Sequence, residues 1–237
     1  MFSAKVLNPK ASVVVGLVLA GGVMFLAACS SSQSGEQRNA APEPAQGFTY
    51  GVTAGAMEST TAKLWTRADA AGPVVATVRT DANFPKACTP NSGGAVWSGT
   101  QTASEAHDLT VTFDAAGLTS GQTYQYRFCT PSGDHSAVGT FKTAPTANQR
   151  ADINFAYTGD FTAETPRGSN STTPFYDSFD VFSSMAKGPL DFAVLGGDVI
   201  YSDSVAGDRK NPTALTVAEK WEKYRLNLRQ QQLQQLQ

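Results

Sequence analysis

Charged residues are scarce in this sequence of 237 residues, and no basic region stands out. They make up 16% of the chain, and the formal net charge is −2. Proteins that hold nucleic acid usually concentrate positive charge on one surface. We therefore expect no nucleic-acid-binding surface, and partners have to be inferred from local chemistry.

Histidine is scarcer still, with two residues in the whole chain, His107 and His135. One lies at the start of an expected strand and the other lies in a turn. Both are interpreted as surface histidines, and neither is assigned as a metal ligand. The sequence therefore offers no histidine ligand after position 135.

The first 28 residues have the pattern of an export signal. Lys5 and Lys10 form a positive n-region, and an uninterrupted apolar stretch runs from Val13 to Ala28. This stretch is shorter than the roughly 20 residues that a membrane-spanning helix needs. The following LAAC, which ends at Cys29, resembles the bacterial lipobox. That resemblance implies a lipid anchor on Cys29 and a membrane-anchored lipoprotein on the periplasmic or cell-surface side. An ordinary signal peptide and a short membrane anchor are the alternatives.

Cysteine is also rare, with three residues in the chain. Residues 29–46 are rich in Ser, Pro and Ala, which predicts a flexible tether after the lipidated Cys29. Cys88 and Cys129 then remain, and an extracytoplasmic setting favours a disulfide between them. Two separate buried thiols are the alternative.

Residues 47–146 contain short runs of β-branched and aromatic residues separated by turn residues. Tyr124, Tyr126 and Phe128 share one face at period two. The pattern predicts an all-β sandwich, and AGLTSGQTYQYRF (Ala116 to Phe128) resembles a fibronectin type III or Ig-like corner closed by a tyrosine. The expected strands are Lys63–Arg67, Val74–Thr80, His107–Asp114, Thr123–Cys129 and Ala137–Thr143.

From residue 151 to residue 237 the pattern changes to strands and helices. Ile153–Asp160 and Asp191–Asp198 are apolar runs that each end in Gly-Asp, and helical spacing covers Phe175–Gly188 between them. A strand–helix–strand unit of this kind predicts two buried parallel strands, and hence an α/β domain. A last helix is expected after a capping-box pair, Thr216 and Glu219. Its expected apolar stripe consists of Val217, Trp221, Tyr224 and Leu228.

Asp160 and Asp198 each follow the carboxyl end of an expected parallel strand. Ligands of α/β sheets bind outside these ends, so we expect the two carboxylates to converge on one crevice. Two close carboxylates repel each other unless a proton or a cation lies between them, which favours a metal ion. Tyr201 lies three residues after Asp198. Its phenolate is a hard ligand that needs a strongly Lewis-acidic ion such as Fe³⁺ to form near neutral pH.

Three segments together resemble the N-terminal domain of the alkaline phosphatase D family. They are FTYGVTAGAMESTTAKLWTR (Phe48 to Arg67), GLTSGQTYQYRF (Gly117 to Phe128) and SAVGTFKTAP (Ser136 to Pro145). In that family the sandwich precedes a calcineurin-like metallophosphoesterase domain of the purple acid phosphatase type. The resemblance implies hydrolysis of phosphate monoesters or diesters outside the cytoplasm by a monomer.

The segment GGDVIY (Gly196 to Tyr201) resembles the second metal motif of the same enzymes. This resemblance implies that Asp198 bridges two metal ions and that Asp160 and Tyr201 bind Fe³⁺. The second ion is expected to be Ca²⁺ or Zn²⁺. Asp203 matches an acidic position of the same loop and is a further candidate ligand.

The family completes its metal centre with later histidines, which this sequence does not contain. The first strand also departs from the family, because Gly159-Asp160 stands where many members have Ser-Cys. We therefore expect residues 151–237 to form an incomplete metallophosphoesterase domain that is inactive alone, as an N-terminal portion of the enzyme. The alternatives are a non-enzymatic surface lipoprotein with a fibronectin-like binding domain and an isolated Ca²⁺ loop at Asp198 and Asp203.

Overall fold

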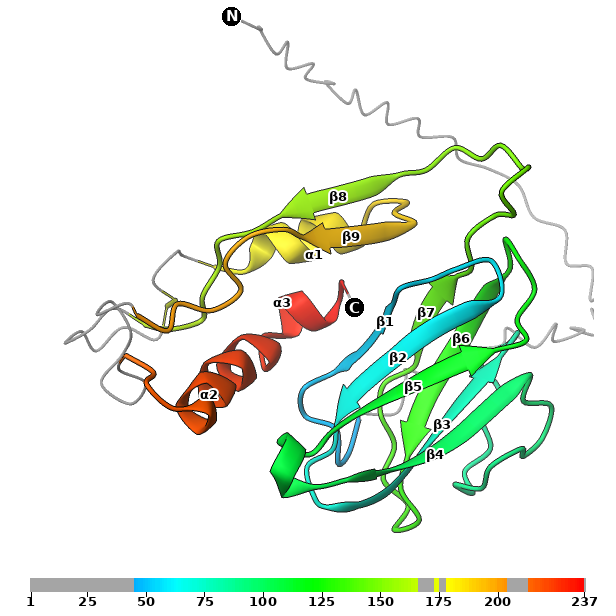
Figure 1. Cartoon of the computed structure of the whole chain (residues 1–237), viewed down its shortest axis with the longest axis horizontal. Coiled ribbons are helices and arrows are strands. Elements are labelled where there is room, and N and C mark those ends of the chain that lie inside the picture. The colour runs from blue at the N-terminus through cyan, green and yellow to red at the C-terminus, as the bar shows by residue number, and fades with distance from the viewer. Residues whose placement is uncertain (1–44, 166–172, 175–177, 204–212, 237) are drawn as a thin grey trace, which may run out of the picture. The chain divides into compact units, whose positions relative to one another are not determined.

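The structure, a computed structural model, describes residues 45–165, 173–174, 178–203 and 213–236 (Figure 1). All of them belong to one unit, Ala40–Gln237. The expected export signal, Cys29 and Phe175 lie outside the described residues. Among the helices that are described, none is long and apolar enough to cross a membrane.

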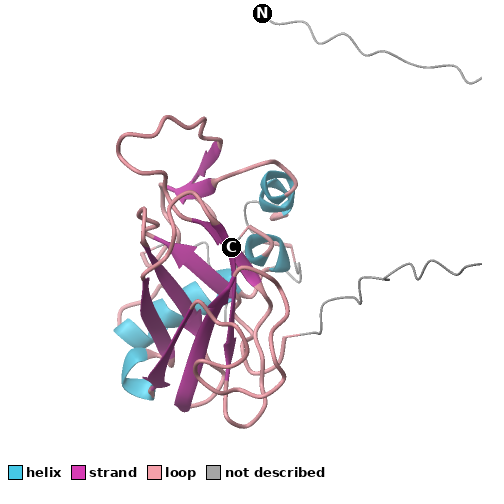
Figure 2. Ribbon diagram, turned by 90° about the vertical axis from the view of Figure 1, so that its right-hand side faces the viewer, coloured by secondary structure: helices cyan, strands magenta, loops and turns pink. Residues whose placement is uncertain are grey.

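Two antiparallel sheets pack face to face as a sandwich, which confirms the all-β prediction for this part of the chain (Figures 1 and 2). One sheet has the strand order β1-β2-β5, and the other has the order β4-β3-β6-β7. The strands are β1 (Val52–Gly55), β2 (Thr61–Arg67), β3 (Gly72–Arg79), β4 (Trp97–Ala103), β5 (Thr110–Ala116), β6 (Thr123–Cys129) and β7 (Gly139–Lys142). A 3₁₀ turn, Glu105–His107, precedes β5 where the sequence predicted the start of that strand.

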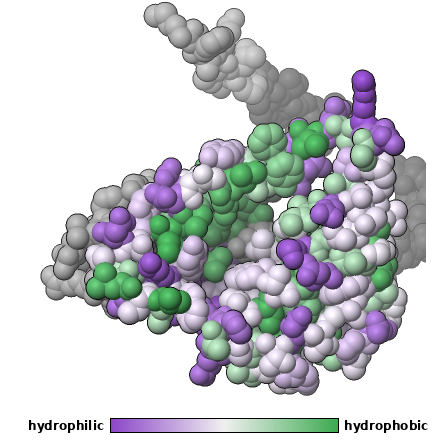
Figure 3. All heavy atoms as spheres, in the orientation of Figure 1, coloured by the Kyte–Doolittle hydropathy of each residue, from purple (hydrophilic) through white to green (hydrophobic). Residues whose placement is uncertain are grey.

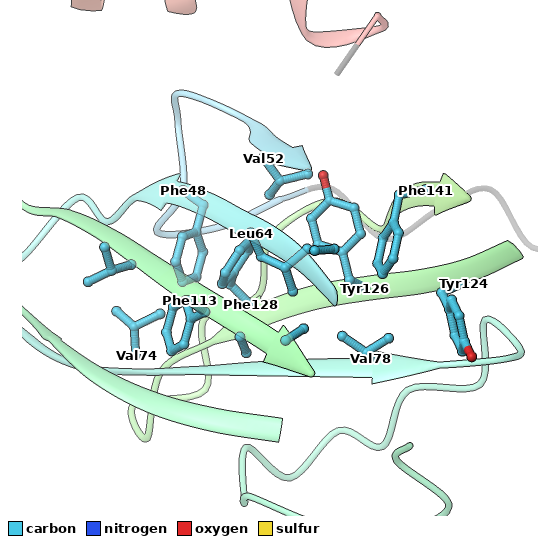
Figure 4. Close-up of a cluster of buried hydrophobic side chains, with 14 of the residues drawn as sticks. Phe48, Val52, Leu64, Val74, Val78, Phe113, Tyr124, Tyr126, Phe128 and Phe141 are labelled. Carbon is cyan, nitrogen blue, oxygen red and sulfur yellow. The ribbon is translucent and has the colours of Figure 1, made fainter. Parts of the chain in front are cut away.

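The sandwich core consists of the side chains that point inward from the strands of both sheets (Figure 4). Tyr124, Tyr126 and Phe128 are all buried, as their shared face predicted. The Phe128 ring packs against Phe113, with 5.7 Å between the ring centroids. The Tyr124 hydroxyl accepts a hydrogen bond from the backbone N–H of Thr119 at 2.8 Å. This bond closes the turn before β6, which confirms the predicted tyrosine corner.

A disulfide joins Cys88, in the loop between β3 and β4, to Cys129 at the end of β6. The two Cα atoms are 5.7 Å apart, within the range that a disulfide spans. The predicted pairing is therefore present. It ties a long surface loop to the central strands of the four-stranded sheet.

A two-stranded parallel sheet follows the sandwich. It pairs β8 (Phe155–Thr158) with β9 (Phe192–Leu195), and α1 (Asp180–Ala186) lies between them in sequence. The parallel pairing agrees with the predicted strand–helix–strand unit, although every element is shorter than expected. Two helices follow, α2 (Val217–Leu228) and α3 (Gln231–Gln234).

The expectation that these two strands are buried is wrong for the described residues. Phe155 is 57% exposed, Tyr157 65% and Leu195 41%. Figure 3 shows hydrophobic surface over this region. The physical reason is that the sheet has only two strands here. The helices instead bury a separate cluster in which Phe161 and Phe182 pack together, with 5.1 Å between their ring centroids.

Helix α2 begins with the predicted capping box, in which the Thr216 hydroxyl accepts from the Glu219 backbone N–H and the Glu219 carboxylate accepts from the Thr216 backbone N–H. The predicted apolar stripe is only partly buried: Leu228 packs against the cluster of Phe161 and Phe182, whereas Tyr224 is 42% exposed. Val217 is 62% exposed, whereas Lys223 and Asn227 are the buried residues of the helix. The most deeply buried residues of α2 are therefore polar, and they need polar partners.

Candidate metal centre

The two Gly-Asp segments leave the sheet at the same edge. Because β8 and β9 are parallel and Thr158 pairs with Leu195, the residues after these positions lie side by side. The backbone N–H of Gly196 donates to the Thr158 carbonyl at 2.7 Å. Beyond the strands, the N–H of Phe161 donates to the Asp198 carbonyl at 3.1 Å. The loops after the two strands are thus joined by backbone hydrogen bonds.

The glycines before the aspartates permit a close approach of the two loops. A Cβ at Gly159 would lie 2.5 Å from the backbone nitrogen of Gly197, which is closer than real Cβ contacts. The sharp turn itself is made by Asp160, whose φ is +56°. Aspartate adopts this left-handed region more readily than most residues other than glycine. At the first strand Asp160 therefore makes the turn itself, and Gly159 supplies the space for the close approach.

The structure brings two of the predicted ligands together. The Tyr201 hydroxyl donates a hydrogen bond to Oδ1 of Asp160 at 3.2 Å, across 41 positions of sequence. Tyr201 is half-buried and Asp160 is exposed, so the pair opens towards solvent. A phenol oxygen and a carboxylate oxygen at this separation are close enough to share one cation.

The other two predicted ligands are less tightly placed. The backbone carbonyl of Asp198 accepts from Phe161, so this residue lies at the same edge of the sheet, and its side chain is exposed. Asp203 is exposed farther along the loop. Neither histidine contributes to this region, since His107 and His135 both belong to the sandwich.

The donor set fits a hard cation, but only in part. Carboxylate and phenolate oxygens are the ligands that ferric iron and calcium accept. Within the described ranges, no group of three or more His, Cys, Asp or Glu side chains is placed to hold a metal ion. The described residues therefore bring together two oxygen donors that a hard cation could use, from Asp160 and Tyr201.

Sequence reasoning missed the residues that hold this edge of the sheet in place. They are Glu164 in the loop after β8, and Lys223 and Asn227 on α2. All three are nearly inaccessible to solvent. The only sequence signal was the spacing of Lys223 and Asn227, one helical turn apart, and two polar residues at that spacing usually lie on a solvated face.

Comparisons with known proteins indicate the same family as the sequence motifs. Residues 30–145 match the family described as PhoD-like phosphatase, N-terminal domain. The solved structure titled "Structure of PhoD" is similar over 83% of this chain and 38% of its own length, with 25% identity and a TM-score of 0.65. No curated protein matches the chain.

Two further solved structures match less than half of the chain. One is the sensor domain of the anti-sigma factor RsgI4 of Pseudobacteroides cellulosolvens, with 15% identity, 40% of this chain, 92% of that chain and a TM-score of 0.28. The other is the FN5 domain of Drosophila Lar, with 18% identity, 44% and 98% coverage, and a TM-score of 0.27. TM-scores this low support no inference about this chain.

The sandwich fold and the family match together define the class of the protein: this chain carries the N-terminal domain of a phosphatase family. The predicted resemblance to the alkaline phosphatase D family is thereby confirmed, because residues 30–145 belong to the N-terminal domain of that family. This is a family of hydrolases that in general depend on metal ions. The chain spans 38% of the length of the PhoD structure that it matches.

Proposed function

We propose that this chain provides part of the metal centre of a phosphoesterase that hydrolyses phosphate monoesters or diesters. The observation that carries the proposal is the contact between Tyr201 and Asp160, 3.2 Å apart at the carboxyl edge of a parallel strand pair. The family of the chain supports the reaction class. The match to 38% of PhoD supports the view that other ligands come from residues outside this chain.

Each residue has a defined role in this proposal. Asp160 and Tyr201 would hold Fe³⁺, and Asp198 would be a ligand for Fe³⁺ and for a second ion, the divalent Ca²⁺ or Zn²⁺. Bound ions of this kind supply Lewis acidity, which activates water and offsets charge on the phosphate. The left-handed turn at Asp160 and the backbone bond from Phe161 to Asp198 keep the ligand-bearing loops together. Asp203, on the same loop as Asp198 and Tyr201, is a further candidate ligand.

A Tyr201-dependent iron complex is the first test. Purified chain titrated with Fe³⁺, supplied as its citrate complex, is expected to develop a visible absorption band from charge transfer between phenolate and iron. Tyr201→Phe should abolish the band, and Asp160→Asn should weaken Fe³⁺ binding. Tyr157→Phe is the matched control, because it removes a tyrosine hydroxyl nearby that donates to the Gly196 carbonyl at 3.1 Å. A band that survives Tyr201→Phe would exclude the proposed ligand.

Hydrolysis is the second test. We propose that the chain alone turns over an aryl phosphate at a negligible rate with Fe³⁺ and Ca²⁺ or Zn²⁺, because no histidine after His135 is available to complete the centre. Turnover that Asp198→Asn abolishes would show that the chain suffices for catalysis. Turnover that Asp198→Asn leaves unchanged would point to a contaminating phosphatase.

We also propose that the protein is exported and anchored to the membrane through lipid on Cys29. The positive n-region, the apolar stretch and the lipobox-like LAAC support this localisation. Metabolic labelling with palmitate in a bacterial host tests it. Label is expected on the wild type and not on Cys29→Ala, while Cys88→Ser serves as the control that retains the label.

A further inference from the structure

The buried face of α2 touches both loops of the candidate metal centre. Lys223 is 2% exposed and Asn227 is 3% exposed, and the two lie one helical turn apart. Burying a lysine and an asparagine is unfavourable unless both are paired. Each has its partner in or beside the loops that carry the predicted ligands.

A single side-chain amide bridges the two loops. Oδ1 of Asn227 accepts from the backbone N–H of Ala163 at 2.6 Å, and Nδ2 of Asn227 donates to the carbonyl of Val199 at 2.5 Å. Ala163 lies three residues after Asp160. Val199 lies between Asp198 and Tyr201. The planar amide of asparagine presents one acceptor and one donor group, as this position requires.

A buried ion pair fixes the first of these loops to the same helix. Nζ of Lys223 lies 2.5 Å from Oε1 of Glu164, and the two side chains are 2% and 3% exposed. Glu164 directly follows Ala163, so Lys223 and Asn227 bind adjacent residues of this loop. Oε2 of Glu164 accepts from the Thr162 hydroxyl at 3.3 Å, which orders the loop further.

The other face of α2 is fixed to the sandwich. Arg225 donates to Asp108, and Arg229, which caps the helix, donates to the Tyr50 hydroxyl at 2.8 Å. These arginines are offset by two positions from Lys223 and Asn227, which places them on roughly the opposite side of the helix. Helix α2 therefore connects the rigid sandwich to the ligand loops.

We propose that Asn227 is a positioning residue for the metal centre, which holds the Asp160 loop and the Asp198–Tyr201 loop at a fixed separation. The inference rests on the metal site proposed above and adds the device that keeps its ligands together. Asn227 does not touch the ion; it acts through the backbone at Ala163 and Val199. Outer residues that orient metal ligands typically contribute about 10- to 100-fold to metal affinity.

Two substitutions separate the two bonds. Asn227→Leu keeps the approximate size and removes both, whereas Asn227→Asp keeps an acceptor for Ala163 and loses the donor to Val199. Gln230→Leu is the matched control, because Gln230 bonds the Leu226 carbonyl on the helix itself at 3.3 Å. The full chain is titrated with Fe³⁺ citrate, and thermal unfolding of the metal-free protein is recorded in parallel.

Asn227→Leu is expected to weaken Fe³⁺ binding roughly 10- to 100-fold and to shift the phenolate–iron band. Asn227→Asp should show a smaller loss, and Gln230→Leu should retain both affinity and band position. The band position reports the ligand geometry, which a uniform loss of stability leaves unchanged. If Asn227→Leu does not fold, Asn227→Asp and amide exchange at Ala163 decide the matter, since the N–H of Ala163 should stay protected only where an acceptor remains.

Failure of this inference is distinguishable from failure of the proposed function. A wild-type chain without a Tyr201-dependent band overturns the metal site and the positioning role together. A wild-type band that both Asn227 variants reproduce, with unchanged affinity, overturns the positioning role alone.

Discussion

Asp108 of the sandwich accepts a hydrogen bond from Arg225 of α2, which lies 117 positions later in the chain. The same carboxylate accepts from Arg67 at 3.1 Å. The side chains of Asp108 and both arginines are only 11–12% exposed. One carboxylate therefore neutralises two poorly solvated cations at the contact between the sandwich and the helix.

Substitution of Asp108 is expected to destabilise the protein. Asp108→Asn keeps a residue that tolerates the φ of +51° found there, so the loss reports charge rather than backbone strain. Arg67 loses its carboxylate partner and Arg225 keeps only the more exposed Glu222, so we expect a cost of about 1–3 kcal/mol in the free energy of unfolding. Urea denaturation measures it.

The control for this substitution is Asp114→Asn. Asp114 pairs with Lys63 on the surface, where the side chains are 75% and 56% exposed. Exposed pairs contribute about 0–1 kcal/mol. Equal losses in the two variants would contradict a special role for Asp108.

Removal of the disulfide should lower stability more than any surface change. The bond between Cys88 and Cys129 closes a segment with a sequence separation of 41. In the chain-entropy model, a loop of that length corresponds to about 4 kcal/mol. The double variant Cys88→Ser, Cys129→Ser is expected to lose about that much in urea denaturation, compared with the wild type under the same non-reducing conditions. A reduced wild type that matches the oxidised wild type would contradict the expectation.

Sequence patterns predicted five of the seven sandwich strands, including β5 and β7 at sheet edges, and missed β1 and β4. Strands β5 and β6 alternate strictly between apolar and polar residues because both pack one face on the core. The missed strands, β1 and β4, are edge strands. In β4 the residues from Thr100 to Thr102 are exposed, so no alternation marks this strand in the sequence. A strand without such alternation is recognised only from its pairing with a neighbour, which a local pattern does not encode.

The candidate site was predictable where it depended on local chemistry. The spacing of Asp198 and Tyr201, together with a parallel strand ending before Asp160, indicated ligands at one edge of a sheet. Asn227 and Lys223 were not predictable, because their burial arises from contacts with residues about 60 positions away. From sequence alone, a polar residue on a helix is predicted to be exposed, because its long-range partner is not known.

Acid should weaken the attachment of the parallel sheet through Asp191. The backbone N–H of Asn154 and, to a smaller extent, Lys142 lower the pKa of the Asp191 carboxyl below its ordinary value. A carboxyl with a depressed pKa stabilises the fold above its unfolded-state pKa, and this stability is lost as the pH falls from about 4 through the lower folded-state pKa.

Titration of the Asp191 carboxyl by NMR checks this sign. Lys142→Met is expected to remove only the smaller part of the depression, since the bond from Asn154, 2.9 Å long, remains. Asp191→Asn should flatten the acid limb of the stability profile. An Asp191 pKa at or above the ordinary value would contradict the hydrogen bonding described here.

The capping box of α2 gives a prediction about the helix that carries Asn227. Thr216→Ala removes the hydroxyl that accepts from the Glu219 N–H, and we expect a loss of about 1 kcal/mol. Lys220→Ala lies on the exposed side of the same helix and should change stability by less than about 0.5 kcal/mol. Thermal unfolding compares the two variants. A Thr216→Ala protein as stable as the wild type would show that tertiary contacts alone fix the start of α2.

Two glycines at the candidate site should differ in their tolerance of alanine. At Gly159 a Cβ would meet the backbone of Gly197 at 2.5 Å, and the loops cannot separate without breaking their hydrogen bonds. At Gly196 a Cβ would meet the Tyr157 ring at 2.2 Å, but that side chain is 65% exposed and can rotate away for the loss of one exposed hydrogen bond, to the Gly196 carbonyl. We expect Gly159→Ala to cost about 1–3 kcal/mol and to weaken Fe³⁺ binding, because the two ligand loops are pushed apart. Gly196→Ala should bind Fe³⁺ as the wild type does, so weaker binding in Gly196→Ala than in Gly159→Ala would contradict the close approach as the reason for glycine.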